Sequence, residues 1–208
     1  MSLPIIEIIH GKAIDAVTAD PWNKAIVGPA LDIVGNAPGS LKIYRGLQTE
    51  EPKHLYVYVA WTELQAHKNF QADPVNYPEV GKRVGSFMVS DRDMFHVEPS
   101  ADPYKALNAP VTELALLTPR PGYTKENVAE KVKTLVESPH SLQEDLGLIS
   151  AFWGPVVEKE NTLALIVGWK SVEAQRGIFA VPQVAALLKA CSEVAELQVT
   201  LASLLEYP

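Results

Sequence analysis

VAWTELQAHKNF (Val59–Phe70) and VGWKSVEAQRGIF (Val167–Phe179) are two versions of one passage. Each runs from an apolar segment through a Trp into a helix-like pattern, and each has Ala five residues after that Trp. At the next position the first passage has His67 and the second has Gln175. A passage written twice indicates a duplicated structural unit, so the residues that differ are the places to look for function.

The repeat extends well beyond these two passages. Trp61 and Trp169 lie 108 residues apart, and the same spacing pairs Gly39 with Gly147, Gly46 with Gly154, Leu55 with Leu163, Val59 with Val167, Ala66 with Ala174, Ala72 with Ala180 and Pro74 with Pro182. At this spacing LPIIEIIH (Leu3–His10) stands opposite VTELALLT (Val111–Thr118). The sequence therefore predicts two homologous halves, 1–100 and 109–208, joined by a linker at 101–108.

Each half shows the same order of predicted elements. The β-branched and aromatic segments predict four strands per half, at Ile5–His10, Leu41–Leu47, Leu55–Trp61 and Asp93–Val97, and at Glu113–Thr118, Leu148–Trp153, Leu163–Trp169 and Leu197–Ala202. One helix is expected after the first strand, where Pro29 should kink or end it in the first half. A second helix, in one or two pieces, starts after each Trp. This order predicts an α+β fold of two ferredoxin-like halves.

Composition limits the classes of protein to consider. The chain has 208 residues and a net charge of −7, which disfavours a nucleic-acid partner because phosphate binding needs a basic stripe. Its apolar runs are too short for a membrane span, and its first residues lack the basic region of a secretory signal. The one cysteine, Cys191, has no partner for an internal disulfide. We expect a cytoplasmic protein with neither membrane nor nucleic-acid partner.

At the strand-to-helix corner the chain resembles the dimeric α+β barrel superfamily, in particular its antibiotic-biosynthesis-monooxygenase-like branch. The residues that carry the resemblance are Trp169, Glu173, Ala174 and Phe179 in one half, and Trp61, Glu63, Ala66, Phe70 and Pro74 in the other. The resemblance implies that the two antiparallel sheets pack into one α+β barrel, so that one chain forms what usually takes two subunits. It leaves open a monomeric pseudo-dimer or a homodimer.

The two halves differ where one of them could hold a pocket. His67 stands opposite Gln175, Asn76 opposite Val184, Tyr56 opposite Ala164, Tyr58 opposite Ile166 and His10 opposite Thr118, while His96 stands opposite the apolar segment LASLL. Histidine titrates near neutral pH and serves as acid or base, and Tyr and Asn orient a carbonyl or phenolate. We therefore predict the pocket in the first half. The candidate catalytic residues are His67, Asn76, His10 and His96, and the candidate substrate-binding residues are Trp61, Tyr44, Tyr56, Tyr58, Tyr77 and Trp22.

The resemblance bears on three of these residues. It places Trp61 at the end of the strand beside the pocket and His67 where some members have a pocket Tyr. Asn76 falls where a polyketide cyclase relative has a catalytic His, and Asn departs from that pattern. Each candidate also has a plainer interpretation: Trp61 as core, His67 as a solvated helix residue, and Asn76 as a turn residue. Likewise, the strand tyrosines could simply fill the core, and His96 could form a surface ion pair.

No sequence motif supports a bound cofactor. His-x-His, HExxH and CxxC are absent, as are GxGxxG, GxxxxGK[ST] and GxSxG, so we expect no metal and no nucleotide. The resemblance allows haem with one histidine as axial ligand. The favoured hypothesis is an enzyme of secondary-metabolism type that acts on an apolar or aromatic small molecule by His-assisted proton transfer, in cofactor-free oxygenation, cyclisation, elimination or isomerisation. The alternatives are a haem or small-ligand binding protein and a non-catalytic stress-related protein.

Overall fold

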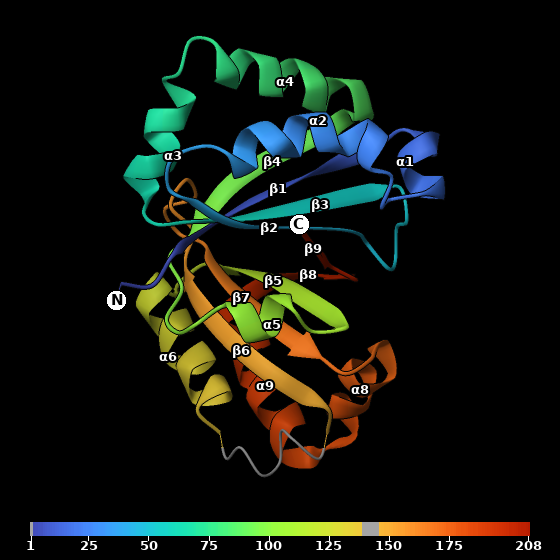
Figure 1. The fold of residues 1–208 in the computed structure, drawn as a ribbon. Helices are drawn as coiled ribbons and strands as arrows, with labels where there is room; N and C mark the ends of the chain where they lie inside the picture. Colours follow the sequence, from blue (N-terminus) through green and yellow to red (C-terminus); the bar gives the residue numbers. More distant parts are fainter. Residues whose placement is uncertain (1, 139–145) are drawn as a thin grey trace. The chain divides into compact units, whose positions relative to one another are not determined.

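The computed structural model describes residues 2–138 and 146–208, and the chain divides into two compact units. The first unit comprises Met1–His96 together with Ala202–Pro208, and the second comprises Val97–Leu201. Within each unit, the longer helices cover one face of an antiparallel sheet (Figure 1). The C-terminal segment thus belongs to the first unit.

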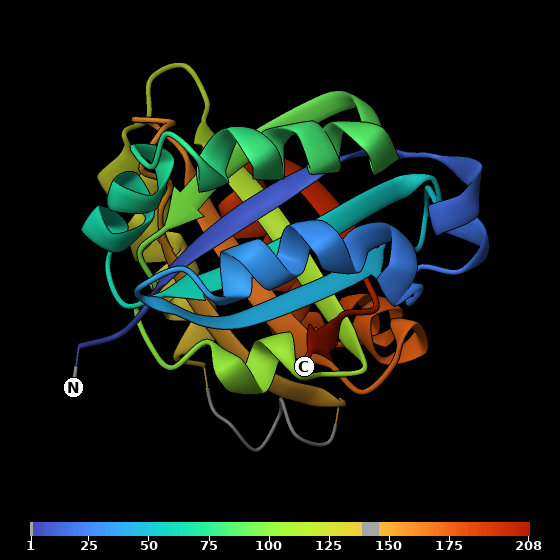
Figure 2. The same cartoon turned by 45° about the horizontal axis from the view of Figure 1, so that its top comes forward.

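The first unit is built on a five-stranded sheet of order β4-β1-β3-β2-β9. Its strands are β1 (Ile5–Ala13), β2 (Ser40–Leu47), β3 (His54–Trp61), β4 (Met88–Val97) and β9 (Leu205–Tyr207). Its helices are α1 (Asp15–Ala19), α2 (Lys24–Gly35), α3 (Leu64–Gln71) and α4 (Asn76–Phe87). Figure 2 shows α2 and α4 side by side across one face of this sheet.

The second unit has a four-stranded sheet of order β6-β7-β5-β8. Its elements are α5 (Tyr104–Leu107), β5 (Val111–Pro119), α6 (Lys125–Val136), β6 (Leu148–Pro155), β7 (Leu163–Trp169), α8 (Val172–Gly177), a 3₁₀ turn η1 (Ile178–Ala180), α9 (Pro182–Val194) and β8 (Ala195–Ala202). The predicted α+β fold with two tandem ferredoxin-like halves is confirmed. The second helix of each half comes in two pieces, α3 and α4 or α8 and α9.

Side-chain alternation along β3 places the core of the first unit. Leu55, Val57 and Val59 point toward the helices and join a buried cluster with α2 and α4. Tyr56 and Tyr58 point to the opposite face of the sheet and are also buried. Burial raises the pKa of Tyr58 well above its ordinary value of 10.0. The central strand is therefore apolar on both faces, as its sequence predicts.

Two repeated glycines are explained by close approach to a neighbouring helix. Gly39 and Gly147 have φ of +89° and +82°, in the left-handed region that favours glycine. A Cβ on Gly39 would lie 2.5 Å from the Cβ of Ala66, and one on Gly147 would lie 2.8 Å from that of Ala174. The repeated Gly and Ala therefore fit one another, and both halves need them to seat the helix after the Trp.

The spacing of 108 is wrong for the first strand of each half. Ile5 pairs with Trp61 in the first sheet, and Val111 pairs with Trp169 in the second, so Ile5 corresponds to Val111 at a spacing of 106. The lengths of the intervening segments differ by two residues, which the sequence pattern alone did not show. As a result Glu7 corresponds to Glu113, and His10 corresponds to Leu116 rather than to Thr118.

Pro29 was predicted to kink or end its helix. It does not end it, because α2 continues from Lys24 to Gly35. Pro29 removes the hydrogen bond that the carbonyl of Ala25 would accept. Buried side chains beyond the proline compensate, since Ala30, Leu31 and Val34 all lie in the core cluster. Tertiary packing thus outweighs the local preference.

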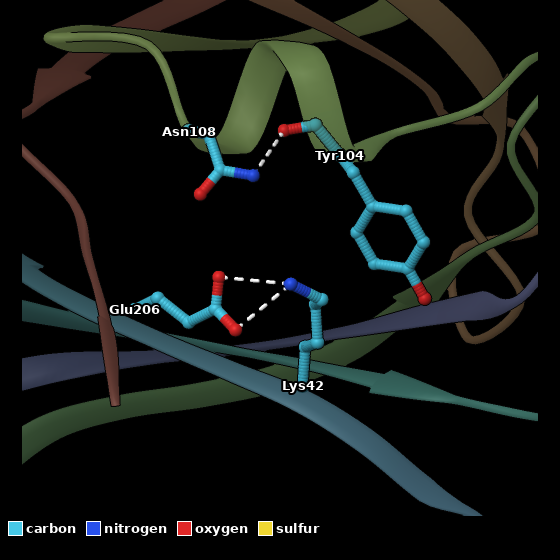
Figure 3. A network of polar contacts seen from close by, with 4 residues as sticks. All are labelled: Lys42, Tyr104, Asn108 and Glu206. Carbon is cyan, nitrogen blue, oxygen red and sulfur yellow. Dashed lines mark hydrogen bonds and ion pairs between the residues drawn. The ribbon is translucent and has the colours of Figure 1, made fainter. Parts of the chain in front are cut away.

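Short polar contacts fix the ends of both units. In the first unit, Lys42 Nζ donates to Glu206 Oε1 at 2.8 Å, joining β2 to the C-terminal β9 (Figure 3). In the second unit, Asn108 Nδ2 donates to the backbone carbonyl of Tyr104 at 2.8 Å and closes α5 (Figure 3). Neither α5 nor β9 was predicted, because each is too short to leave a periodic pattern.

Tyr207 gives the C-terminal strand a pH-dependent contact. Burial and the hydrogen bond that its hydroxyl donates to Asp32 Oδ1 at 2.6 Å raise the pKa of Tyr207 to about 12, above its ordinary 10.0. The protonated phenol therefore stabilises the folded state fully below pH 10, and this contribution disappears as pH rises through about 12. We expect the stability difference between the wild-type protein and Tyr207→Phe to shrink over this range in urea titrations. A difference that stays constant with pH would contradict this assignment.

Among the described residues no single helix has the length and apolar character of a membrane span. One sharply bent pair, Val172–Ala180 with Pro182–Val194 at 92°, reaches that length and composition only when both helices are counted together.

Candidate active site

Glu7 is a buried carboxylate in the apolar first half of β1. It lies on β1 with 4% of its surface exposed, on the sheet face that carries the helices. The indole Nε1 of Trp61, at the end of β3, donates to Glu7 Oε2 at 2.7 Å. This bond is possible because β1 and β3 pair with Ile5 opposite Trp61, which leaves Glu7 two residues further along the same face.

His67 lies on α3, the helix that follows Trp61 and packs against the sheet. Its ring stacks on the indole of Trp61 with centroids 4.8 Å apart and planes 19° apart. Its Nε2 lies 3.5 Å from Glu7 Oε1, and only 2% of the residue is exposed. The interpretation of His67 as a solvated helix residue is therefore wrong, because the helix turns this position inward.

His96 completes a chain of buried polar groups at the end of β4. Its Nε2 lies 2.7 Å from His67 Nδ1, and 2% of the residue is exposed. Two ring nitrogens at this distance share one proton, so one imidazole donates and the other accepts. Trp61, Glu7, His67 and His96 thus form one connected line of buried polar groups, in which the carboxylate of Glu7 can balance a positive charge on the imidazole of His67.

An apolar cavity of about 290 Å³ opens beside this line. Glu7, His67, Tyr77, Arg92 and Asp93 are its polar or titratable lining residues. Most of the remaining wall comes from aliphatic and aromatic side chains of the sheet, α2, α3 and α4, including Val57, Val59, Leu31, Val34, Phe70, Phe87, Met88 and Met94. Such a cavity suits a small apolar ligand whose reacting atom is presented to a few polar groups.

The second unit keeps the scaffold of this site without its histidines. Trp169 Nε1 donates to Glu113 Oε2 at 2.9 Å, which repeats the contact between Trp61 and Glu7. Gln175 takes the place of His67. Val97 forms a bridge with Val156, and Gln48 forms one with Ala202. Gln48 and Val156 correspond at the spacing of 108, so Val97 corresponds to Ala202. His96 therefore corresponds to Leu201, a core residue of the second unit.

The cavity at the equivalent place in the second unit is also smaller, at about 60 Å³. Its lining includes Glu113, Trp169, Gln175 and Val184. The paired histidines and the larger cavity therefore occur together in the first unit only, among the residues that the structure describes. This asymmetry supports the choice of the first half as the site.

The structure places the other candidate residues, except Tyr77, away from this line. His10 lies on the opposite face of the sheet, stacked on Tyr56 with centroids 5.0 Å apart and with Nε2 3.9 Å from Asp93 Oδ2. Tyr44, Tyr56 and Tyr58 share that opposite face, and none of them is among the residues that line the cavity. Tyr77 lines the cavity, whereas Trp22 is 37% exposed and contacts Arg45.

Asn76 is exposed at the start of α4 and does not line the cavity. Its backbone N–H and its side-chain amide both donate to the carboxylate of Asp73 at 2.8 Å. These bonds hold the pKa of Asp73 below its ordinary value. The turn interpretation describes Asn76 well, because its contacts fix the entry to the helix rather than face a ligand.

Glu7 was missed by the sequence analysis, although a signal for it exists. It is the one charged residue in IIEII (Ile5–Ile9), and its counterpart Glu113 interrupts a similar apolar run. An isolated carboxylate at equivalent places in two buried strands predicts a buried partner. The spacing of 108 concealed this match, because it set Glu7 opposite Ala115.

Comparison with known proteins places this geometry in context. No family model matches the sequence, and no curated protein matches it either. A candidate monooxygenase from Fusobacterium nucleatum is similar in structure, with a TM-score of 0.69 at 9% identity, over 99% of this chain and 98% of that one. The chain shares its fold with this protein over nearly its whole length. Two further structures with this monooxygenase-like fold cover nearly the whole chain.

The first of these two is a candidate monooxygenase from Lactobacillus acidophilus, with a TM-score of 0.66 at 12% identity, over 98% of this chain and 94% of that one. The second is an anthrone oxidase-like protein, with a TM-score of 0.69 at 10% identity, over 97% of this chain and 91% of that one. At such low identity the likeness shows the monooxygenase-like fold alone.

The bond between Trp61 and Glu7 gives a test of how tightly the site is built. Trp61→Phe keeps an aromatic ring but removes the N–H that the buried carboxylate accepts. We expect a loss of about 1–3 kcal/mol in the free energy of unfolding, since the group left behind is desolvated. Trp169→Phe is the matched control, and because Glu113 is half-buried its loss should be smaller. Urea denaturation of both variants measures the difference, and equal losses would refute a special role for the first pair.

Proposed function

We propose that the chain is an enzyme that binds an apolar or aromatic small molecule in the cavity of the first unit and moves a proton at His67. The observation that carries the proposal is the buried line of Glu7, His67 and His96, of which Glu7 and His67 line an apolar cavity. The second unit supports it, because it repeats the Glu–Trp pair but has Gln175 and Leu201 in place of the histidines.

The geometry suggests a role for each group. His67 Nδ1 is already within 2.7 Å of His96, so we assign Nε2 as the atom that accepts a proton from the substrate. The carboxylate of Glu7, 3.5 Å from that nitrogen, stabilises the imidazolium that forms. His96 fixes the orientation of the ring and shares its other proton. The apolar walls exclude water, which strengthens these interactions.

Oxygenation is the reaction class to test first. Removal of a proton from an activated carbon gives a carbanion that O₂ can oxidise, and the proposed site supplies the base without a metal or nucleotide. One structural neighbour is described as anthrone oxidase-like, so anthrone is a reasonable first substrate. Conversion of its CH₂ to a carbonyl consumes one O₂, places one oxygen atom in the product and releases the other as water. Cyclisation, elimination and isomerisation need the same base and remain within the proposal.

The experiment is oxygen uptake by the purified protein with anthrone and with related phenolic carbon acids. We expect enzyme-dependent uptake that His67→Gln slows by about 10²–10⁴-fold and Glu113→Gln leaves unchanged, because Glu113 lies in the second unit. Uptake that persists at the wild-type rate in His67→Gln would refute the role of this histidine. Absence of any reaction across carbon acids, cyclisable and isomerisable substrates would refute the enzyme proposal.

A small-molecule binding protein without turnover is the second candidate, and the mainly apolar lining of the cavity favours it. Native mass spectrometry of the purified protein would reveal a retained ligand. Haem is tested separately by visible absorption after haem addition. The absence of a Soret band would exclude haem.

A further inference from the structure

Glu7, His67 and His96 also have the composition of a metal-ligand set. One nitrogen or oxygen from each residue lies within 4.8 Å of the atoms from the other two. All three residues are buried, with at most 4% of their surface exposed. The three residues come from β1, α3 and β4, which are far apart in the sequence, so they form no local sequence motif. This explains why a search for His-x-His or HExxH spacing could not find the set.

The chemistry of the set suits a divalent transition metal. Two imidazoles and one carboxylate bind Zn²⁺ or Fe²⁺ when further positions stay open. With metal–ligand bonds of about 2.0–2.1 Å, neighbouring ligand atoms lie about 3.0–3.4 Å apart. His67 Nδ1 and His96 Nε2 are 2.7 Å apart, and His67 Nε2 and Glu7 Oε1 are 3.5 Å apart. One imidazole offers an ion only one of its two nitrogens, and with one ligand atom from each residue the three atoms lie within 4.8 Å of one another. Side-chain rotations that shorten the widest of these separations by up to about 1.5 Å would bring the three ligand atoms into range.

We propose that Glu7, His67 and His96 bind one divalent transition-metal ion, which replaces the proton shared by the two histidines. Trp61 would act as an outer-shell residue, because its indole N–H already fixes the carboxylate of Glu7 at 2.7 Å. Glu7 and His67 line the cavity, so the remaining coordination positions would be filled from it. Binding does not rest on the proposed reaction. An ion held by His67 would block proton transfer there, so metal would inhibit a metal-free enzyme.

The second unit supplies a matched control within the same chain. Glu113 and Trp169 repeat the carboxylate and its donor, but Gln175 stands where His67 does and Leu201 where His96 does. A carboxylate with one amide is a poor site for Zn²⁺. We therefore expect one ion per chain rather than two.

The test is equilibrium dialysis of the full chain against Zn²⁺, without substrate, followed by measurement of the metal content. We expect one Zn²⁺ per chain in the wild-type protein and in Glu113→Gln and His54→Gln. His67→Gln and His96→Gln should each weaken binding at least about tenfold, and Trp61→Phe about tenfold. No uptake by the wild-type protein, or uptake unchanged in both histidine variants, would overturn the proposal.

A spectroscopic measurement covers the case in which a histidine variant fails to fold. Cu²⁺ added to the wild-type protein should show electron paramagnetic resonance couplings to two imidazole nitrogens. Couplings to none or one would contradict the site. Both measurements are made without turnover, so their failure leaves the proposed reaction standing, and failure of the oxygen-uptake experiment leaves the metal site standing.

Discussion

Gly46→Ala should lower the free energy of unfolding of the first unit by about 3 kcal/mol or more. A Cβ on Gly46 would overlap the backbone carbonyl of Ser203, and a backbone atom cannot move aside as the end of a flexible side chain can. The segment Ala202–Pro208 would have to leave β2, with loss of the pairing between β2 and β9. Chemical denaturation measures the loss, and limited proteolysis should then release the C-terminal residues.

Two further glycines provide a second test position and a control for this prediction. Gly154→Ala should be equally damaging, because its Cβ would overlap the backbone carbonyl of Glu98. Gly81→Ala is the control, since its Cβ would meet nothing within 4 Å and alanine favours the helix by about 1 kcal/mol. If Gly46→Ala unfolds at the same denaturant concentration as Gly81→Ala, the close approach of β2 to the C-terminal segment is wrong.

His67→Gln should lower kcat/KM by about 10²–10⁴-fold for any substrate on which the wild-type protein acts. Glutamine cannot accept and return a proton as imidazole does, and it also breaks the contact with His96. The fold should tolerate the change, because the second unit carries Gln175 at the equivalent place with only 7% of its surface exposed. Steady-state kinetics with oxygen uptake as the readout would measure the effect.

Gln175→His provides the reciprocal control for this prediction. It places a histidine in the second unit, where Leu201 rather than a second histidine corresponds to His96. We expect no gain and no loss of activity. If His67→Gln keeps wild-type kinetics while the protein remains folded, proton transfer at this residue is excluded.

Most of the fold could be predicted from the repeat between the two halves of the sequence. Trp61, Ala66 and Gly39 recur at one spacing because a strand end, a helix and a tight turn must meet in both halves. The order of strands and helices followed from apolar periodicity around these points. What the pattern could not supply was the docking of short pieces such as β9, which depends on contacts with residues far away in sequence.

The candidate site was only partly predictable. His67 and His96 were found because one half has histidine where the other is polar but uncharged, or apolar. Their meeting across 2.7 Å could not be foreseen, since it depends on how α3 leans toward the end of β4. Glu7 was hidden by a two-residue change in spacing. Asn76 was placed by family resemblance, and the local turn at Asp73 determines its actual contacts.

The most direct test of the central claim uses the methionines of the chain. Only three occur, Met1, Met88 and Met94, and the last two line the cavity of the first unit. Protein labelled with ¹³C in its methionine methyl groups should show chemical-shift changes at Met88 and Met94 when anthrone or a co-purified ligand is added. A ligand that binds while both signals stay unmoved would contradict the placement of the site in the first unit.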